Sequence, residues 1–192
     1  SGHYDCPVDY KGTAQDERTE AMNIELRPGD VFCTANPWLL GRIILWTERM
    51  WSHDNEALYG HAGIVDTPAG STFEALWRIR HAHLGDYIGK PIIIARPRAE
   101  QGKLDERLAI LKERFEGKRY PLHRLFMHVL PPVAKMGSGN FVVCSELVAA
   151  YLWMLGLRHK QYLGTNPDTL ADEWRQGYCC DVIFEGLLDF PI

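Results

Sequence analysis

The sequence predicts an α+β fold. Strand-like apolar segments bounded by turn residues group between residues 61 and 96, and apolar residues at helical spacing follow over residues 104–117 and 144–155. A last short apolar segment follows near residue 183. Strands that precede a run of helices, instead of alternating with them, indicate an α+β architecture and not a parallel α/β sheet.

Length and composition indicate one domain. The chain has 192 residues, of which 46% are hydrophobic and 24% are charged. This is enough apolar material for a core, so disorder along the whole length is excluded. We expect a single domain over residues 26–192 after a polar leader over residues 1–25.

Charge and hydropathy narrow the class of protein. The 21 basic and 25 acidic side chains give a net charge of -4, which disfavours a nucleic-acid-binding protein. No apolar run reaches the length of a membrane-spanning helix, and the first residues contain no apolar signal-peptide region. We therefore expect a soluble protein without stable membrane insertion, and leave its compartment and oligomeric state open.

The first elements are delimited by turn and cap residues. Pro28-Gly29 precedes the apolar Val31-Phe32, which predicts a turn followed by a strand. Residues 37–51 carry apolar side chains at helical spacing, with Pro37 in the first turn and Asn36 as the cap. This segment predicts an amphipathic helix.

A β-hairpin is predicted over residues 61–77, because the turn residues of 66–71 separate two apolar segments. A six-residue turn would give the pairs Val65–Thr72, Gly63–Glu74 and His61–Leu76. His61 and Glu74 then lie on one face as diagonal neighbours, close enough for their side chains to meet. A register slip of one residue would move Glu74 to the other face.

Helical spacing begins at Leu104, and Gly117 is placed to end that helix. A second helix is predicted from Cys144 to just before Gly156. Its apolar residues lie on nearly every side, which is typical of a buried helix. The remaining predictions are a strand over 91–96, a loop over 131–140, a short helix after Asn166-Pro167-Asp168 and a strand over 182–184.

The cysteines predict neither a disulfide framework nor a metal site. Their number is odd, and no two pairs have the spacing of zinc ligands. We expect reduced cysteines, no metal and no cofactor. The five are Cys6, Cys33, Cys144, Cys179 and Cys180.

Cys144 differs from the others because it begins the buried helix. Backbone N–H groups and the helix dipole converge at a helix N-terminus, and both favour a thiolate. The same N–H groups are suited to hold a developing oxyanion. A structural cysteine that caps a core helix is the alternative explanation.

A thiolate nucleophile needs a neighbouring base. Of the eight histidines, His61 is the best placed, because it opens an apolar strand between Gly60 and Gly63. Glu74 on the partner strand would orient the imidazole ring and stabilise its cation. The alternatives are a half-buried structural histidine and a solvated glutamate.

The order of four motifs resembles the circularly permuted branch of the papain-like NlpC-type amidases and peptidases, the YiiX-like group. The motifs are Pro28-Gly29-Asp30-Val31, Gly60-His61-Ala62-Gly63-Ile64-Val65, Phe73-Glu74-Ala75 and Cys144-Ser145-Glu146-Leu147. Gly117-Lys118-Arg119-Tyr120 and Asn166-Pro167-Asp168-Thr169-Leu170 also have counterparts in that group. The resemblance extends over about residues 26–175.

The resemblance implies a fold and a chemistry. The fold would be an antiparallel sheet or half-barrel packed on helices, with the nucleophile at the N-terminus of a central helix. Cys144 would be the nucleophile, His61 the base and Glu74 the orienting group, while Tyr120 and Ser145 would bind substrate. The activity would be cleavage of an amide bond in a short peptide, such as a peptidoglycan peptide, through a thioester.

Two other functions remain open at this stage. A lipid acyltransferase or thioesterase of the related lecithin-retinol-acyltransferase-like branch would use the same thioester chemistry. The Trp-rich segment 37–51 would suit a fatty chain, but that branch tends to carry histidine where Glu74 stands. A non-catalytic peptide-binding module is the other alternative. The deubiquitinase-like permuted group is disfavoured, because its cysteine motif is rich in asparagine.

Overall fold

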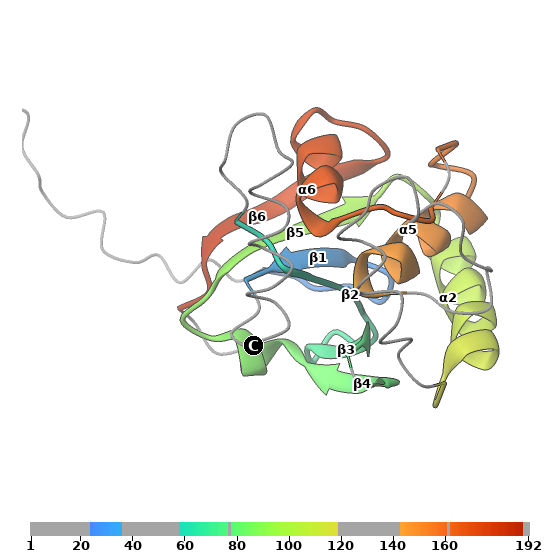
Figure 1. Cartoon of the computed structure of the whole chain (residues 1–192), viewed down its shortest axis with the longest axis horizontal. Coiled ribbons are helices and arrows are strands. Elements are labelled where there is room, and N and C mark those ends of the chain that lie inside the picture. Colours follow the sequence, from blue (N-terminus) through green and yellow to red (C-terminus); the bar gives the residue numbers. More distant parts are fainter. Residues whose placement is uncertain (1–23, 36–57, 77, 119–142, 161, 190–192) are drawn as a thin grey trace, which may run out of the picture.

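The computed structural model describes residues 24–35, 58–76, 78–118, 143–160 and 162–189 (Figure 1). These residues form a six-stranded sheet in the order β4-β3-β2-β1-β5-β6, in which every neighbouring pair is antiparallel. Helices accompany the sheet, so the α+β class is confirmed. The strands are β1 (Val31–Thr34), β2 (His61–Val65), β3 (Ser71–Ala75), β4 (Ile79–His83), β5 (Pro91–Pro97) and β6 (Cys180–Leu187); the helices are η1 (Leu84–Tyr87), α2 (Gln101–Phe115), α5 (Cys144–Met154) and α6 (Pro167–Arg175).

The turn before β1 depends on a glycine. Gly29 has a φ of 91°, and a Cβ atom there would lie 2.6 Å from the hydroxyl of Tyr151 and 2.9 Å from Cβ of Leu104. Only glycine fits both the left-handed backbone and this close approach. The next residue, Asp30, is fully buried and binds the guanidinium of Arg96 through both carboxylate oxygens at 2.9 Å. This contact ties the start of β1 to β5.

The predicted hairpin register is confirmed in the β2–β3 ladder, which pairs Val65 with Thr72 and Gly63 with Glu74. The pair His61–Leu76 does not form. The ladder stops at Gly63, and the N–H of Leu76 donates instead to the carbonyl of Arg78 at 3.1 Å.

The sheet separates two clusters of buried side chains. Alternate residues point to opposite faces of a strand, so Ala62 and Ile64 of β2 join the larger cluster together with α2, α5 and α6. Phe32 and Val65 join the smaller cluster on the other face, with Tyr87 of η1. In Figure 1 the helices lie along one side of the sheet, and η1 and β4 lie at its lower edge. His61 begins β2 at one end of the strand, and it shares the second face with Phe32 and Tyr87.

The predicted helices near residues 104 and 144 are confirmed. α2 ends at Phe115, and Gly117 adopts the left-handed φ of 72° that follows many helices. α5 is buried along most of its length, and Gly156 has a φ of 74° just beyond its end. The strands predicted over 91–96 and 182–184 are present within β5 and β6. The leader over 1–25, the helix over 37–51 and the loop over 131–140 lie wholly or mainly outside the described residues.

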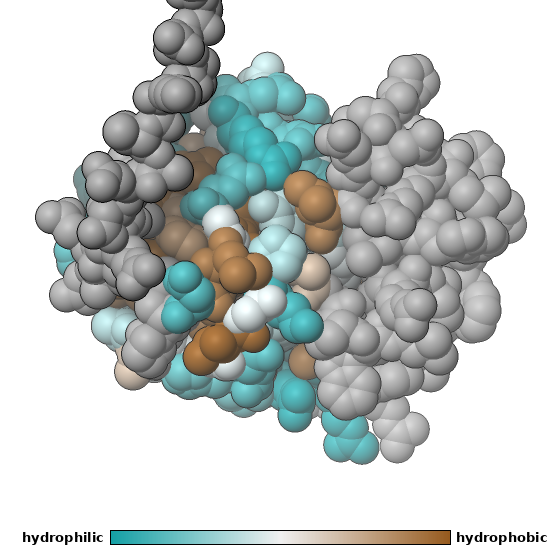
Figure 2. Space-filling model, turned by 90° about the vertical axis from the view of Figure 1, so that its left-hand side faces the viewer, coloured by the Kyte–Doolittle hydropathy of each residue, from teal (hydrophilic) through white to brown (hydrophobic). Residues whose placement is uncertain are grey.

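The described surface is mixed in polarity. Figure 2 shows one side of the molecule, where hydrophobic residues form a patch bordered by hydrophilic ones. Exposed apolar residues are common on protein surfaces, so they do not by themselves indicate a partner. Large apolar side chains that are more than half exposed are Leu58, Ile88, Trp153, Tyr178 and Leu187.

Candidate active site

The first residue of α5 meets the first residue of β2. The thiol of Cys144 hydrogen-bonds with the imidazole of His61. Both side chains are almost fully buried, with 4% and 1% of their surfaces exposed. The helix N-terminus and the beginning of the strand therefore lie together, although 82 residues of chain separate these two side chains in the sequence.

The second ring nitrogen of this histidine is held by a carboxylate. Nε2 of His61 lies 2.8 Å from Oε2 of Glu74, whose side chain is fully buried. An ionised carboxylate only accepts hydrogen bonds, so Nε2 must carry a proton and donate it. The other ring nitrogen, Nδ1, is then left to exchange a proton with the sulfur of Cys144.

Glu74 accepts hydrogen bonds from two further side chains. The hydroxyl of Tyr87 donates to Oε2 at 2.6 Å, and the hydroxyl of Thr72 donates to Oε1. Burial alone raises the pKa of Glu74, but the hydrogen bonds from His61, Thr72 and Tyr87 hold it below the ordinary value. Glu74 is therefore an ionised, fixed acceptor.

The charge state of His61 follows from these contacts. Burial lowers the pKa of the imidazole, whereas hydrogen bonds with Cys144 and Glu74 and the charge of Glu74 raise it, and the net result is a pKa raised to about 10. The ring also contacts Tyr87 and Phe32, at centroid distances of 5.8 Å and 6.3 Å. His61 is thus an imidazolium at neutral pH, held between a sulfur atom and a carboxylate.

A glycine makes room for the carboxylate. A Cβ atom on Gly63 would lie 2.6 Å from Cζ of Phe32 and 2.8 Å from Cγ of Glu74. Gly63 is also the residue that pairs with Glu74 across the ladder. Any side chain at this position would displace the ring, the glutamate or both.

The start of α5 is fixed by a second buried glutamate. Glu146 accepts hydrogen bonds from the N–H of Val143 at 3.1 Å and from the N–H of Gly164 at 2.7 Å. The hydroxyl of Ser145 donates to the carbonyl of Thr165 at 2.6 Å. These three contacts anchor the residues on both sides of Cys144, so the first helical N–H groups have a defined direction.

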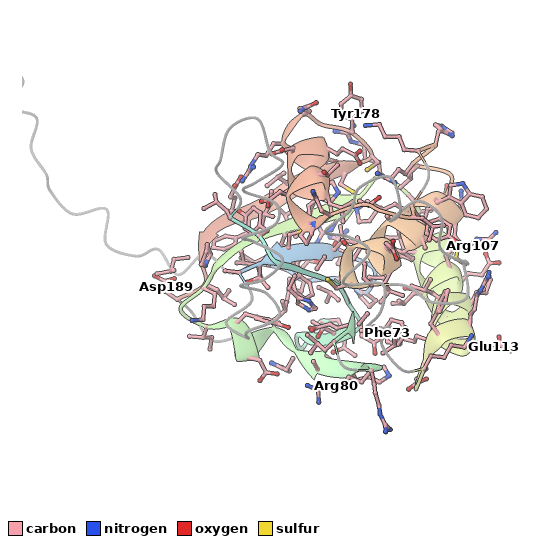
Figure 3. All side chains as sticks on the ribbon, in the orientation of Figure 1. Phe73, Arg80, Arg107, Glu113, Tyr178 and Asp189 are labelled. Carbon is pink, nitrogen blue, oxygen red and sulfur yellow. The ribbon has the colours of Figure 1, made fainter. Side chains whose placement is uncertain are left out.

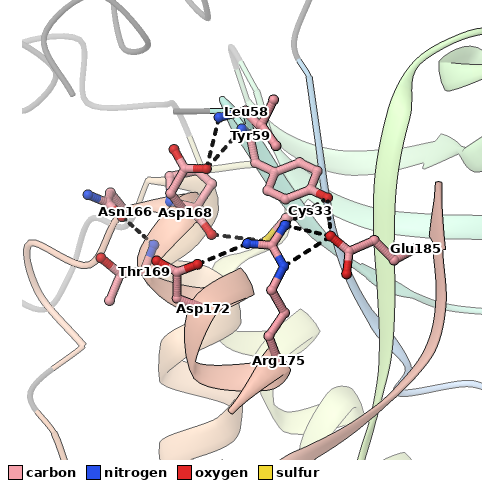
Figure 4. A network of polar contacts seen from close by, with 10 residues as sticks. Cys33, Leu58, Tyr59, Asn166, Asp168, Thr169, Asp172, Arg175 and Glu185 are labelled. Carbon is pink, nitrogen blue, oxygen red and sulfur yellow. Dashed lines mark hydrogen bonds and ion pairs between the residues drawn. The ribbon is translucent and has the colours of Figure 1, made fainter. Parts of the chain in front are cut away.

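α6 holds the chain just ahead of His61. Oδ1 of Asp168 accepts from the N–H groups of Leu58 and Tyr59, each at 3.1 Å (Figure 4). The hydroxyl of Tyr59 then donates to Glu185 of β6 at 3.1 Å, and Arg175 at the end of α6 binds the same carboxylate. In this way α6 and β6 together fix the two residues that lead into Gly60 and His61.

The structure thus brings three of the predicted site residues, Cys144, His61 and Glu74, into one connected group. The hydroxyl of Ser145 is directed to a backbone carbonyl, and Tyr120 lies outside the described residues. Sequence reasoning missed Thr72, Tyr87 and the role of Asp168. Thr72 lies two residues before Glu74, so the predicted strand places both side chains on one face and indicates that they are neighbours. No local pattern indicates the contact of Tyr87 with Glu74.

No group of three His, Cys, Asp or Glu side chains in the described part of the chain is arranged to hold a metal ion. No helix among the described residues is long and apolar enough to cross a bilayer.

Comparisons with known proteins do not assign a family. A scan against models of protein families finds no match, and a search of curated proteins finds no relative. The function of the chain is therefore inferred from the geometry of the site and from the order of the motifs in the sequence.

Proposed function

We propose that this protein is a cysteine hydrolase that cleaves amide bonds through a Cys144–His61–Glu74 triad. The observation that carries the proposal is the position of His61, which hydrogen-bonds with Cys144 on one side and with Glu74 on the other. A nucleophile, a proton carrier and an orienting group in contact are the arrangement that acyl transfer requires.

In the first half of the reaction, the thiolate of Cys144 attacks the carbonyl carbon of the scissile amide. The carbonyl oxygen becomes an oxyanion, which the N–H groups in the first turn of α5 are oriented to stabilise. The imidazolium of His61 then donates its proton to the departing amine nitrogen. The carbon–nitrogen bond breaks, the amine leaves, and a thioester remains on Cys144.

In the second half, water hydrolyses the thioester. Neutral His61 takes a proton from the attacking water, and the thiolate of Cys144 leaves with the electrons of the carbon–sulfur bond. Glu74 stays ionised throughout and stabilises the imidazolium each time it forms. The carboxylic acid is released and the thiolate–imidazolium pair is restored.

The permuted papain-like fold and a peptide substrate belong to the same proposal. A histidine on a strand, a glutamate on the neighbouring strand and a later cysteine at a helix start occur here in the order of the YiiX-like group. The six-stranded antiparallel sheet with its helices is compatible with that fold. By this resemblance the substrate is a short peptide, such as a peptidoglycan fragment.

The test is hydrolysis of a panel of muropeptides, short peptides and acyl esters by the wild-type chain and by Cys144→Ala. We expect release of free amine by the wild type, none by Cys144→Ala, and unchanged release by Cys179→Gly as a matched cysteine control. Acid quenching followed by mass spectrometry should find the acyl group on the peptide that contains Cys144.

Three results would count against the proposal. Equal turnover by Cys144→Ala would exclude the nucleophile. Transfer of acyl groups to lipid or alcohol acceptors without amide cleavage would favour the acyltransferase. Peptide binding that survives Cys144→Ser, with no turnover of any substrate by the wild type, would favour a binding module.

A further inference from the structure

Two adjacent cysteines occupy the junction between α6 and β6, away from the triad. Cys179 has a φ of 56°, and among the described residues it is the one residue other than glycine with a positive φ. The N–H of Cys180 donates to the carbonyl of Tyr178 at 2.6 Å, which closes a tight turn around Cys179. The exposed side chain of Tyr178 is labelled at the outer surface in Figure 3. A left-handed conformation is costly for a residue with a side chain, and such residues often mark functional positions.

This turn brings two sulfur atoms together. Successive side chains of an extended chain point to opposite sides, so neighbouring cysteines are normally held apart. Here Sγ of Cys179 lies 3.6 Å from Sγ of Cys180. Cys179 is partly exposed, whereas Cys180 is fully buried at the start of β6. One thiol is therefore open to a reagent from solvent, and the other lies directly behind it.

The surroundings make the two thiols unequal. The hydrogen bond with Cys180 lowers the pKa of Cys179, and the nearby guanidinium groups of Arg158 and Arg98 also lower it, against the opposing effects of burial and Glu173. The hydrogen bond with Cys179 and burial raise the pKa of Cys180. Cys179 is thus the more acidic thiol of the pair, and Cys180 is the less acidic one.

We propose that Cys179 and Cys180 form a redox-active dithiol, a modification site at which a peroxide produces a vicinal disulfide. The thiolate of Cys179 attacks one peroxide oxygen, the oxygen–oxygen bond breaks, and Cys179 becomes a sulfenic acid while hydroxide, or alkoxide from an alkyl peroxide, leaves. The sulfur of Cys180 then attacks the sulfur of Cys179 and loses its proton, and water departs. Each cysteine supplies one of the two electrons that reduce the peroxide.

The resulting disulfide is expected to be easily reduced. Cα atoms across a trans peptide are about 3.8 Å apart, whereas disulfide-linked residues usually have Cα atoms roughly 4.4–6.8 Å apart. The bond would therefore be strained, and strained disulfides have more oxidising potentials than structural ones. A small thiol should restore the dithiol, which makes the modification reversible.

The experiment uses the full chain carrying Cys144→Ala, so that its outcome does not depend on the proposed function. Limiting hydrogen peroxide is added, free thiols are alkylated, and the peptide that contains both cysteines is analysed by mass spectrometry. We expect that peptide to lose two hydrogens, to resist alkylation, and to recover both thiols after treatment with dithiothreitol. Prior binding of phenylarsine oxide, which bridges close thiol pairs, should block the change.

Two further variants assign the roles of the thiols. Cys179→Gly fits the left-handed backbone without strain and should abolish both the disulfide and the arsenical binding at this position. Cys180→Ala removes the second thiol, so a sulfenic acid that reacts with dimedone should accumulate on Cys179. If circular dichroism shows that Cys180→Ala does not fold, the results with Cys179→Gly alone decide the test.

The proposal would be overturned by either of two results. In the first, the peptide that contains both cysteines stays reduced at peroxide doses that modify the other cysteines, or reaches sulfinic acid without forming a disulfide. In the second, arsenical binding is the same in Cys179→Gly as in the parent chain.

Discussion

Nε2 of His61 lies 2.8 Å from Oε2 of Glu74, and at most 1% of either side chain is exposed to solvent. A buried imidazolium and a buried carboxylate stabilise each other only while both are charged and hydrogen-bonded. This pair therefore links the proposed catalytic chemistry to the stability of the fold.

The pH dependence of stability follows from the same pair. The pKa of His61 is raised from 6.5 to about 10 in the folded chain. Its stabilising contribution is therefore complete below about pH 6.5 and is lost as the pH rises through about 10. Denaturant unfolding from pH 6 to pH 10 should show a falling free energy of unfolding, and His61→Gln should flatten that slope. An equal slope in both proteins would contradict the assignment.

Glu74→Gln tests the orienting carboxylate without changing its shape. The neutral amide no longer compensates for the buried imidazolium, so the pKa of His61 should fall. The basic limb of the kcat/KM profile should then move to lower pH by about one unit or more, with kcat about a hundredfold lower. A profile that keeps its wild-type limb would show that Glu74 does not control the proton on His61.

Tyr87→Phe removes one donor to Glu74 and leaves the ring in place. A hydrogen bond to a buried carboxylate contributes about 1.5–3 kcal/mol, so thermal and denaturant unfolding should detect the loss. Because Thr72 and His61 still hold Glu74, we expect kcat to remain within about tenfold of the wild type, a change of about 1.4 kcal/mol. A complete loss of turnover in a folded variant would place Tyr87 in the reaction itself.

Gly63→Ala should disturb the site by crowding the side chain of Glu74. The new methyl group would overlap Phe32 and Glu74, at a cost of about 1–3 kcal/mol, and it should lower kcat by displacing the carboxylate. Gly102→Ala is the matched control, because no atom lies within 4 Å of a Cβ atom placed there in α2. That control should keep full activity and be slightly more stable, since alanine favours a helix. Similar losses in both variants would remove the steric explanation.

Asp168 provides a test of positioning at a distance from the reacting atoms. Asp168→Ala removes the acceptor for the N–H groups of Leu58 and Tyr59, whereas Asp168→Asn retains an oxygen in the same place. We expect Asp168→Ala to lower kcat with little change in KM and Asp168→Asn to restore most of the activity. Equal defects in the two variants would indicate that the charge of Asp168, and not its contact with the backbone, is what matters.

The part of the site that depends on local rules was predictable from sequence. A six-residue turn between alternating apolar strands fixed the register that places Glu74 beside His61. A helix with apolar residues on all sides placed Cys144 at a buried N-terminus. Neither inference needed a contact between distant parts of the chain.

The rest of the site depends on contacts that leave no local pattern. β4 is an edge strand whose residues include exposed Arg80 and His81 and partly exposed His83, so it lacks the apolar alternation of a half-buried strand. η1 has four residues. Its Tyr87 contacts Glu74, 13 residues earlier in the sequence, because β4 runs antiparallel to β3 and brings the chain back toward Glu74. The contact between Asp168 and Leu58 spans 110 residues, which a local pattern does not indicate.

The pairing of Cys144 with His61 is tested most directly by the rate at which iodoacetamide alkylates Cys144. The measurement compares Cys179→Gly, which lacks the thiol whose pKa is lowered by its neighbours, with the same chain carrying His61→Ala. We predict rapid alkylation of Cys144 at neutral pH in the first protein, and in the second a rate lower by about tenfold or more. Equal rates in the two proteins, or an inert Cys144 in the first, would contradict the account.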